Sequence, residues 1–323
     1  MGRTVLGIAT TMVAALLAAC GVAMLAVKGP AQAAFPGQNG RIAYVSQLES
    51  GFHQIYTMNP DGTERKRLTD PSAYDTSPAY SPDGKRIAFV SQREGQVSDI
   101  HHEQIYTMNA KDGTDQKNLS GSTDGREPAY SPNGKKIAFV GQGEDEDILV
   151  MNATDGSARK HLTNTPPVNG YEVRERDPAY SPDGTKIVFY KETFRPHDVD
   201  LYTMNAKRPL LRPWVKPATR QITDYRGQEY SPDWSPSGDR IVFYQDTPNR
   251  GLRILTIRPD GTDRQLVVKD GKDPVWSPNG KKIAFTRDGH VYTVNPDGTN
   301  EREVPGTSET GLSEVLPNWG PKP

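Results

Sequence analysis

Short apolar runs recur along the chain, each directly after a turn that contains proline and glycine. The segment SPDGKRIAFV at residues 81–90 returns with small changes at residues 131–140, 181–190, 235–244 and 277–286. After each turn, apolar side chains occupy consecutive positions, as in the letters IAFV of the first copy. A strand that is apolar on both faces is buried on both faces. Each copy therefore predicts a tight turn followed by an interior strand.

Each unit begins ahead of this turn with the pattern proline-x-aromatic-serine, which spans residues 78–81 in the first complete copy. Proline cannot donate a hydrogen bond to a β-ladder, so we expect this strand to have one unpaired edge facing a central channel. In the turn, Pro82 fixes φ at the second position, and Gly84 can adopt the positive φ that leads into a hairpin.

A second hairpin completes each unit. Its first strand reads QIYTMN at residues 54–59 and again at residues 104–109, and a tight turn such as residues 59–62 follows. Its second strand is polar and ends in RLT, NLS, HLT or QIT. Charged side chains on such an outer strand discourage pairing with other chains. Each unit is therefore expected to contain four antiparallel strands.

The units repeat along the whole chain after residue 34. Their aligned turn glycines lie 42 to 54 residues apart, within the range of propeller blades. These glycines are Gly40, Gly84, Gly134, Gly184, Gly238 and Gly280. Six units of four strands predict an all-β fold, a six-bladed β-propeller of four-stranded antiparallel blades. A stacked solenoid would instead require atypical capping repeats at both ends.

The two ends of the repeat region complement each other. The first unit lacks its proline-x-aromatic strand, and residues 316–319 near the C-terminus, Leu-Pro-Asn-Trp, resemble that missing strand. We therefore expect the C-terminal strand to lie beside the first hairpin and to close the ring.

The repeat also resembles that of a known family. The segment at residues 177–206, DPAYSPDG through DLYTMNA, resembles the WD-like repeat of the TolB-like six-bladed propellers. The opening FPGQNGRIAYVS at residues 35–46 is similar to exported members of that group, and the resemblance covers residues 35–323. TolB carries a separate N-terminal α/β domain before its propeller. We expect a propeller without that domain here, so the resemblance does not bring the Tol-Pal role with it.

Residues 1–34 differ from the repeats. Arg3 precedes an apolar run, and a small-residue site for cleavage after Ala33 follows, an order typical of a secretory signal peptide. The run is also long enough for a membrane anchor, and residues 17–20 spell a lipobox that would lipidate Cys20. All three alternatives place residues 35–323 outside the cytoplasm, as a periplasmic, secreted or outer-face membrane-tethered domain. Cys20 is the only cysteine, so packing without disulfides must stabilise this domain.

Composition limits the partners. The chain is 34% hydrophobic with a mean hydropathy of −0.71, which suits many small strands better than one large core. The net charge is −1 with both signs interspersed, which excludes the basic footprint of a nucleic-acid-binding protein. We expect a monomer that contacts a membrane only through its N-terminal segment, if that segment is retained.

Motifs for catalysis are absent from the sequence. It contains no G-x-S-x-G nucleophile elbow, which the peptidases with related propellers require. The histidines lack metal-binding spacings and are predicted to be solvated; they are His53, His101, His102, His161, His197 and His290. The acidic run at residues 144–147 predicts a solvated hairpin tip, with a cation site as the alternative. We therefore expect no catalytic residue, no cofactor and no bound metal.

Binding is expected on one face of the propeller. The connections between second and third strands and those between units share this face, vary in length, and are called the loop face below. At the channel mouth on that face, strongly polar residues precede the inner-strand prolines; they are Arg126, Glu127, Arg176, Asp177, Glu229, Lys272 and Asp273. They could bind a peptide or sugar by charge-assisted hydrogen bonds, or pair with one another between blades. On the opposite face, an insertion at residues 207–217 offers Leu210, Leu211 and Trp214 as a further candidate contact.

Together these patterns predict a non-catalytic, extracytoplasmic propeller that binds a protein or peptide partner in the cell envelope through its loop face and channel mouth. The alternative hypothesis is a glycan- or peptide-processing enzyme with a metal or carboxylate site in the channel.

Overall fold

The computed structural model describes residues 35–47, 51–93, 102–141, 146–194, 196–206, 218–307 and 314–323, and all regular secondary structure in these ranges is β-strand. The predicted signal peptide or anchor and the insertion at residues 207–217 lie outside the described residues. Within the described ranges, no helix has the length and apolarity that crossing a membrane requires.

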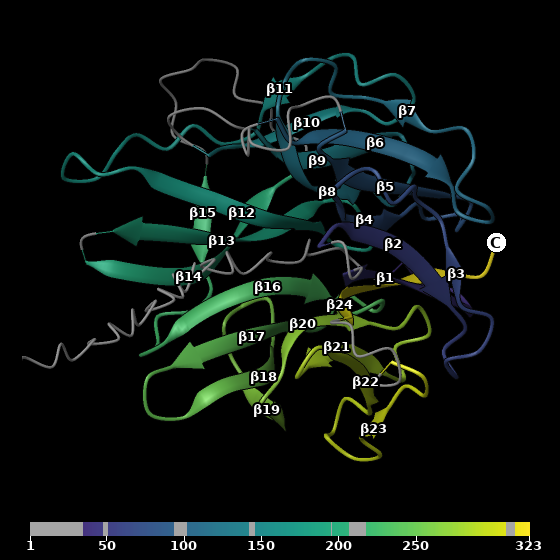
Figure 1. Ribbon diagram of the computed structural model, residues 1–323. Coiled ribbons are helices and arrows are strands. Elements are labelled where there is room, and N and C mark those ends of the chain that lie inside the picture. Colours follow the sequence, from purple (N-terminus) through teal and green to yellow (C-terminus); the bar gives the residue numbers. More distant parts are fainter. Residues whose placement is uncertain are drawn as a thin grey trace, which may run out of the picture.

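The strands form four-stranded antiparallel units (Figure 1). The first three units are β24 (Glu314–Pro321), β1 (Asn39–Gln47), β2 (His53–Met58) and β3 (Lys66–Arg67); β4 (Asp75–Tyr80), β5 (Arg86–Ser91), β6 (Gln104–Asn109) and β7 (Lys117–Asn118); and β8 (Gly125–Tyr130), β9 (Lys136–Gly141), β10 (Ile148–Asn152) and β11 (Lys160–His161).

The remaining units are β12 (Val173–Tyr180), β13 (Lys186–Phe194), β14 (His197–Asn205) and β15 (Thr219–Gln221); β16 (Gln228–Trp234), β17 (Ile241–Thr247), β18 (Gly251–Ile257) and β19 (Gln265–Lys269); and β20 (Lys272–Trp276), β21 (Ile283–Arg287), β22 (His290–Val294) and β23 (Arg302–Glu303). One parallel bridge, between Val199 and Gln228, joins the units that begin with β12 and β16 into an eight-stranded sheet.

The units are arranged around a common centre, with the first strand of each unit innermost (Figure 1). Inner strands contact one another in sequence, from β4 through β8, β12, β16 and β20 to β24, and β24 contacts β4. The C-terminal strand β24 pairs antiparallel with β1, where Ile42 lies opposite Trp319. It also reaches the following unit, because the Asn318 side-chain oxygen accepts a hydrogen bond from the backbone of Tyr80 at 3.0 Å.

The core lies between neighbouring units. The second strand of each unit is buried on both faces, as the sequence predicted, with Ile87, Ala88 and Phe89 of β5 fully buried. The predicted turn is also present, since the Gly84 N–H donates to the Ser81 carbonyl at 2.9 Å and Gly84 has a φ of 68°. A Cβ on Gly84 would lie 2.4 Å from the Pro321 carbonyl oxygen, so this turn packs directly on β24.

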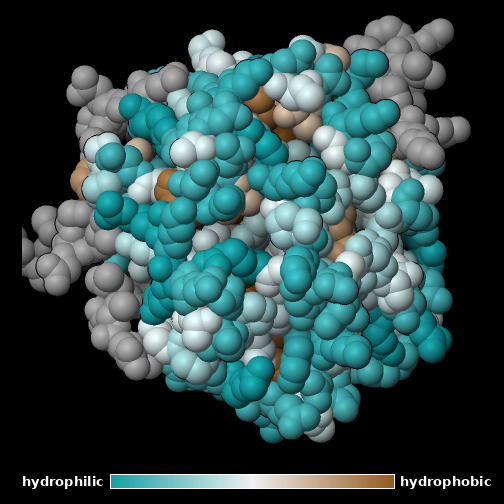
Figure 2. All heavy atoms as spheres, turned by 90° about the vertical axis from the view of Figure 1, so that its right-hand side faces the viewer, coloured by the Kyte–Doolittle hydropathy of each residue, from teal (hydrophilic) through white to brown (hydrophobic). Residues whose placement is uncertain are grey.

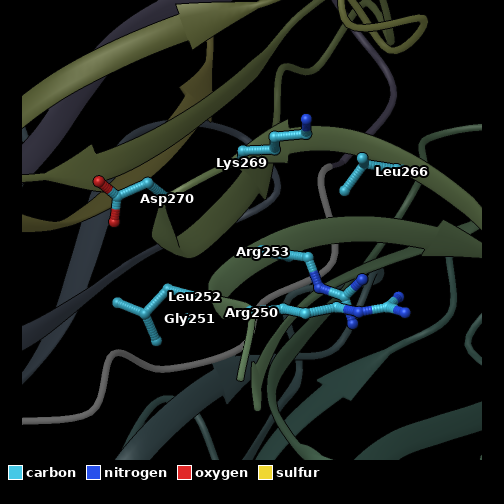
Figure 3. Close-up of a pocket in the computed structure, with 7 residues that line it drawn as sticks. All are labelled: Arg250, Gly251, Leu252, Arg253, Leu266, Lys269 and Asp270. Carbon is cyan, nitrogen blue, oxygen red and sulfur yellow. The ribbon is translucent and has the colours of Figure 1, made fainter. Parts of the chain in front are cut away.

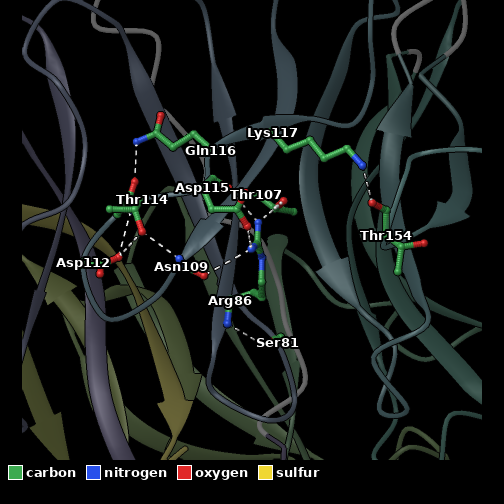
Figure 4. Close-up of polar contacts among 11 residues, drawn as sticks. Ser81, Arg86, Thr107, Asn109, Asp112, Thr114, Asp115, Gln116, Lys117 and Thr154 are labelled. Carbon is green, nitrogen blue, oxygen red and sulfur yellow. Dashed lines mark hydrogen bonds and ion pairs between the residues drawn. The ribbon is translucent and has the colours of Figure 1, made fainter.

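The tight turns lie on the right-hand side of Figure 1 and the loop face on the left. On the tight-turn face each unit stabilises its own turns, as in Figure 4, where Arg86 donates to Thr107 and forms an ion pair with Asp115. Neighbouring units are joined there by lysine-to-carbonyl hydrogen bonds such as that from Lys117 to Thr154 at 2.8 Å. Seen from this side, the surface is mostly hydrophilic, with small scattered hydrophobic spots (Figure 2).

The outer strands are not alike. β3, β7, β11 and β23 have two residues each and β15 has three, and these strands are polar, as the sequence predicted. β19 is longer, with five residues, and it carries the apolar sequence LVV at residues 266–268. This strand departs from the polar rim expected for every unit, because Val267 and Val268 are buried in the core of the eight-stranded sheet.

Candidate functional site

A repeated backbone feature marks the inner wall of the propeller. The residue directly before each inner-strand proline has a positive φ of 47° to 57°; these residues are Ser77, Glu127, Asp177, Ser231, Asp273 and Leu316. The strand pairing shifts register at each of these positions, so the residue and its proline form a β-bulge. Positive φ is sterically costly for residues other than glycine, and a residue before proline is normally extended. Such strain persists only where the surrounding structure enforces it.

Buried polar side chains at these bulges connect neighbouring inner strands. A Glu127 carboxylate oxygen on β8 accepts a hydrogen bond from the backbone N–H of Asp177 on β12 at 2.7 Å. An oxygen of the fully buried Asp177 accepts one from the Ser231 hydroxyl on β16 at 3.1 Å. Asp233 on β16 in turn accepts one from the backbone of Trp276 on β20 at 2.7 Å. The carboxylates therefore hold adjacent units together from the inside.

Cations surround these carboxylates at the loop-face end of the same strands. Arg126 forms an ion pair with Glu103, and one of its nitrogens lies 3.5 Å from a Glu146 oxygen. Arg176 also pairs with Glu146, and Arg174 lies 3.7 Å from it. We call these five residues, together with Glu127 and Asp177, the channel-mouth cluster. The side chains of Arg126 and Arg176 are 24% and 16% exposed, so this cluster forms a charged but internally paired rim.

Burial and neighbouring charges together set the pKa values in this cluster. Burial lowers the pKa of the Arg176 guanidinium, but the carboxylates of Glu127 and Glu146 outweigh it, so that the pKa is raised above its usual range. Burial also raises the pKa of Tyr190 well above its usual value, and the negative charges of Asp177 and Glu127 add to that effect. Arg176 therefore stays charged and Tyr190 stays neutral in the folded protein.

The structure brings some of the sequence-predicted site residues together and separates others. Arg126, Glu127, Arg176 and Asp177 meet in the channel-mouth cluster, whereas Lys272 and the buried Asp273 lie on β20. Glu127 contacts the backbone of Asp177 in the next unit, whereas Arg126 and Arg176 form their ion pairs with Glu103 and Glu146, which were not among the predicted residues. Glu103, Glu146, Arg174 and Tyr190 are further members of this region that sequence reasoning did not identify. Glu103 and Glu146 lie in loops, one and two residues before a strand. This position in the sequence does not indicate which side chain each of them contacts.

Glu229 occupies a different position from the one the sequence suggested. The residue before the proline of β16 is Ser231, and Glu229 lies in the seam between β14 and β16. There the Thr223 hydroxyl is 3.2 Å from a Glu229 oxygen and 3.0 Å from an oxygen of Asp200. Burial raises the pKa of Glu229 to about 8, with Asp200 contributing, and burial with Asp198 raises the pKa of Asp200 to about 6. The Thr223 hydroxyl thus lies between the two carboxyl groups, and the higher pKa of Glu229 makes it the member of the pair that holds a proton near neutral pH.

The candidates for metal chemistry are dispersed. The described histidines lie in different units, with His53 and His197 at the starts of strands β2 and β14; His101 is outside the described residues. Of the acidic run at residues 144–147, Glu146 contacts arginines and Asp147 contacts Thr163 and His161. Within the described ranges, no three His, Cys, Asp or Glu side chains are grouped as a metal site requires.

Comparisons with known proteins agree with this architecture. The model of the TolB beta propeller domain matches residues 25–189 and 114–322. A Tol-Pal system protein TolB from Zymomonas mobilis is 37% identical over 79 residues, which cover 22% of this chain and 16% of that protein. A dipeptidyl-peptidase 5 from Porphyromonas gingivalis is 43% identical over 44 residues, which cover 14% of this chain and 6% of the peptidase. The matched regions are thus a small part of either relative.

A solved structure is similar over most of the chain. The crystal structure of TolB from Acinetobacter baumannii superimposes with a TM-score of 0.70 at 22% sequence identity. The superposition covers 89% of this chain and 68% of that protein, and at this identity it supports the fold alone.

Proposed function

Because the chain belongs to the TolB β-propeller domain family, we propose that it is a non-catalytic, exported propeller that binds a protein or peptide partner of the cell envelope through its loop face. A Tol-Pal system protein among its relatives supports an envelope partner. The proposal includes residues 1–34 as the signal peptide or anchor that exports the domain, and residues 35–323 as a monomeric propeller. The short similarity to a peptidase lies in the repeat and brings no nucleophile elbow with it.

We further propose that the domain has six blades and that β24 closes the ring. The pairing of Ile42 with Trp319, and the packing of Gly84 against the Pro321 carbonyl, support this closure. Deleting residues 314–323 is expected to leave β1 with an open edge and to make the protein aggregate, because unpaired strand edges recruit other chains. Light scattering of the truncated protein measures its aggregation, and thermal melting measures its stability. A monomeric truncation with unchanged stability would show that the tail does not close the ring.

The observation that carries the binding proposal is the charged rim of the channel-mouth cluster. Arg126 and Arg176 remain partly exposed, while their carboxylate partners hold both guanidinium groups in place. A side chain that is already ordered loses little conformational entropy on binding, so it favours recognition of a partner. Lys272, which is partly exposed at the equivalent position of β20, extends this rim around the centre. These residues offer charge-assisted hydrogen bonds to a polypeptide that lies across the mouth.

Site-specific photocrosslinking in the native cell tests this proposal. A photoreactive amino acid replaces Lys272 or Arg174 at the mouth, and in matched controls it replaces Lys111 or Lys281 on the tight-turn face. All four side chains are at least partly exposed, so the substitutions leave the core intact. We expect the same crosslinked partner from both mouth positions and none from the control positions. Crosslinks from the control positions alone, or none from the mouth, would overturn the proposal.

A further inference from the structure

Two adjoining cavities, of about 500 and 570 Å³, follow the outer half of the unit formed by β16–β19. Both are lined by Arg250 and Arg253, so they form one continuous groove, part of which is shown in Figure 3. We call it the arginine groove and define it by Tyr225, Arg226, Arg250, Arg253, Arg264 and Lys269. It is separate from the channel-mouth cluster, because it lies on β18, β19 and the connections beside them.

The cations of this groove have no ion-pair partners within the described part of the chain. Five positively charged side chains line it, and the only carboxylate in its lining is that of Asp270. Figure 3 shows Asp270 at the opposite end from the guanidinium groups of Arg250 and Arg253, which lie side by side. Burial lowers the pKa of Arg253, and the like charges of Arg250 and Arg264 lower it further. This mutual repulsion is relieved when an anion binds.

The polar neighbours of Arg253 hold its guanidinium in position. Arg253 donates a hydrogen bond to the side-chain oxygen of Gln245, and the nitrogen of the same Gln245 donates to Glu229. The Arg253 Nε atom is buried and has no hydrogen-bond partner among the described residues. The Glu229 carboxyl group acts in the opposite direction on the pKa of Arg253, but its own raised pKa of about 8 weakens this compensation near neutral pH. Gln245 therefore holds the Arg253 guanidinium in place beside the groove.

The rest of the groove suits an extended polypeptide better than a single small anion. The Arg264 guanidinium stacks 3.9 Å from the centre of the Tyr225 ring, which orders a second cation beside an aromatic surface. Leu266 is 46% exposed, the largest exposure among the large hydrophobic side chains of the described residues. Leu266 belongs to β19, whose outer edge pairs with no other described strand. Open strand edges and alternating side-chain contacts are what extended peptides bind.

We propose that the arginine groove binds an extended, acidic segment of a partner protein alongside β19. Carboxylates of the segment contact Arg250, Arg253 and Arg264, and an apolar side chain of the segment covers Leu266. A lone phosphate would satisfy one or two guanidinium groups and leave most of the groove, together with Leu266, uncovered.

Fluorescence anisotropy with the purified full chain tests this proposal. The probe is a short labelled peptide in which glutamate and leucine alternate, and the control peptide has lysine in place of glutamate. We expect the acidic peptide alone to bind, and we expect Arg250→Gln combined with Arg253→Gln to weaken its binding at least about tenfold. The matched control is Arg258→Gln, which removes one exposed arginine of the same unit outside the groove. Rising ionic strength should weaken the binding of the peptide to the wild-type chain.

Three results would overturn the proposal. The first is equal binding of the acidic peptide to the wild-type chain and to the double variant, and the second is equal binding of both peptides. The third is binding of inorganic phosphate or of phosphatidylglycerol vesicles that the double variant abolishes, while the peptide does not bind. The photocrosslinking at Lys272 and Arg174 reports on the channel mouth independently, so the two proposals fail or hold separately.

Discussion

The channel-mouth cluster and the arginine groove use the same residue type in opposite ways. At the mouth, Arg126 and Arg176 each have a carboxylate partner within the protein, and hydrogen bonds link the buried acids to the next inner strand. In the groove, Arg250 and Arg253 face each other without a carboxylate between them. The first arrangement holds units together, and the second is incomplete without a ligand. Pairing at the mouth thus stabilises the fold and orders the arginines there, whereas the arginines of the groove lack such compensation within the protein.

Removing a paired acid should cause the largest effect. Glu127→Ala leaves the buried N–H of Asp177 without its acceptor and reduces the charge compensation of Arg176. Breaking a buried charged contact in this way lowers the free energy of unfolding by about 3–5 kcal/mol. Urea denaturation of the purified protein, followed by circular dichroism, measures the change.

The matched substitution in the groove is Arg250→Ala. Because Arg250 is exposed and has no ion pair with a described residue, its loss should change the free energy of unfolding by no more than about 0.5 kcal/mol. Equal destabilisation by both substitutions would contradict the distinction between the two regions.

An effect of intermediate size is expected at Glu229, whose neighbour Gln245 contacts Arg253 of the groove. Its pKa in the folded protein is raised to about 8 from an ordinary value of 4.5, so the folded state binds the proton more tightly than the unfolded state. The resulting stability is complete below pH 4.5 and is lost as the pH rises toward 8. Glu229→Gln keeps the size of the side chain and an acceptor for Gln245, and it cannot ionise. Above pH 8 we expect the variant to melt higher than the wild type by about 2–4 °C.

The control for this pH effect is Glu64→Gln, which alters an exposed glutamate on the tight-turn face. Its melting temperature should follow the wild-type pH dependence. If Glu229→Gln also followed that dependence, the protonated state of Glu229 would be excluded.

Most of the fold could be predicted from the sequence because the repeat specifies it locally. The turn at Ser81 to Gly84 and the buried strand after it depend on neighbouring residues, and both were predicted correctly. The pairing of β24 with β1 was also predicted, since the proline-x-aromatic pattern is missing at one end and present at the other. Local pattern does not, however, explain why β19 is longer and more apolar than the other outer strands, because its burial depends on the eight-stranded sheet.

The candidate sites were less predictable because they depend on contacts between distant residues. Arg176 and Glu146 are recognisable as polar loop or strand-end residues, but their pairing follows only from the packing of two units. Glu229 was assigned to the ring of residues before the prolines, but it lies three residues before Pro232, and Ser231 takes the position directly before that proline. No sequence pattern predicts the arginine groove, because Tyr225, Arg250 and Arg264 come from three separate connections.

The pairing of β1 with β24 has a consequence for how the protein is made. Ile42 is among the earliest residues of the domain to leave the ribosome, and its partner Trp319 is among the last. Contacts between residues so far apart in sequence form slowly, because a long loop must close first. The side of β1 that pairs with β24 therefore stays uncovered until the strand around Trp319 has been made. The sheet of the first unit can thus be completed only after β24 at residues 314–321 has been synthesised.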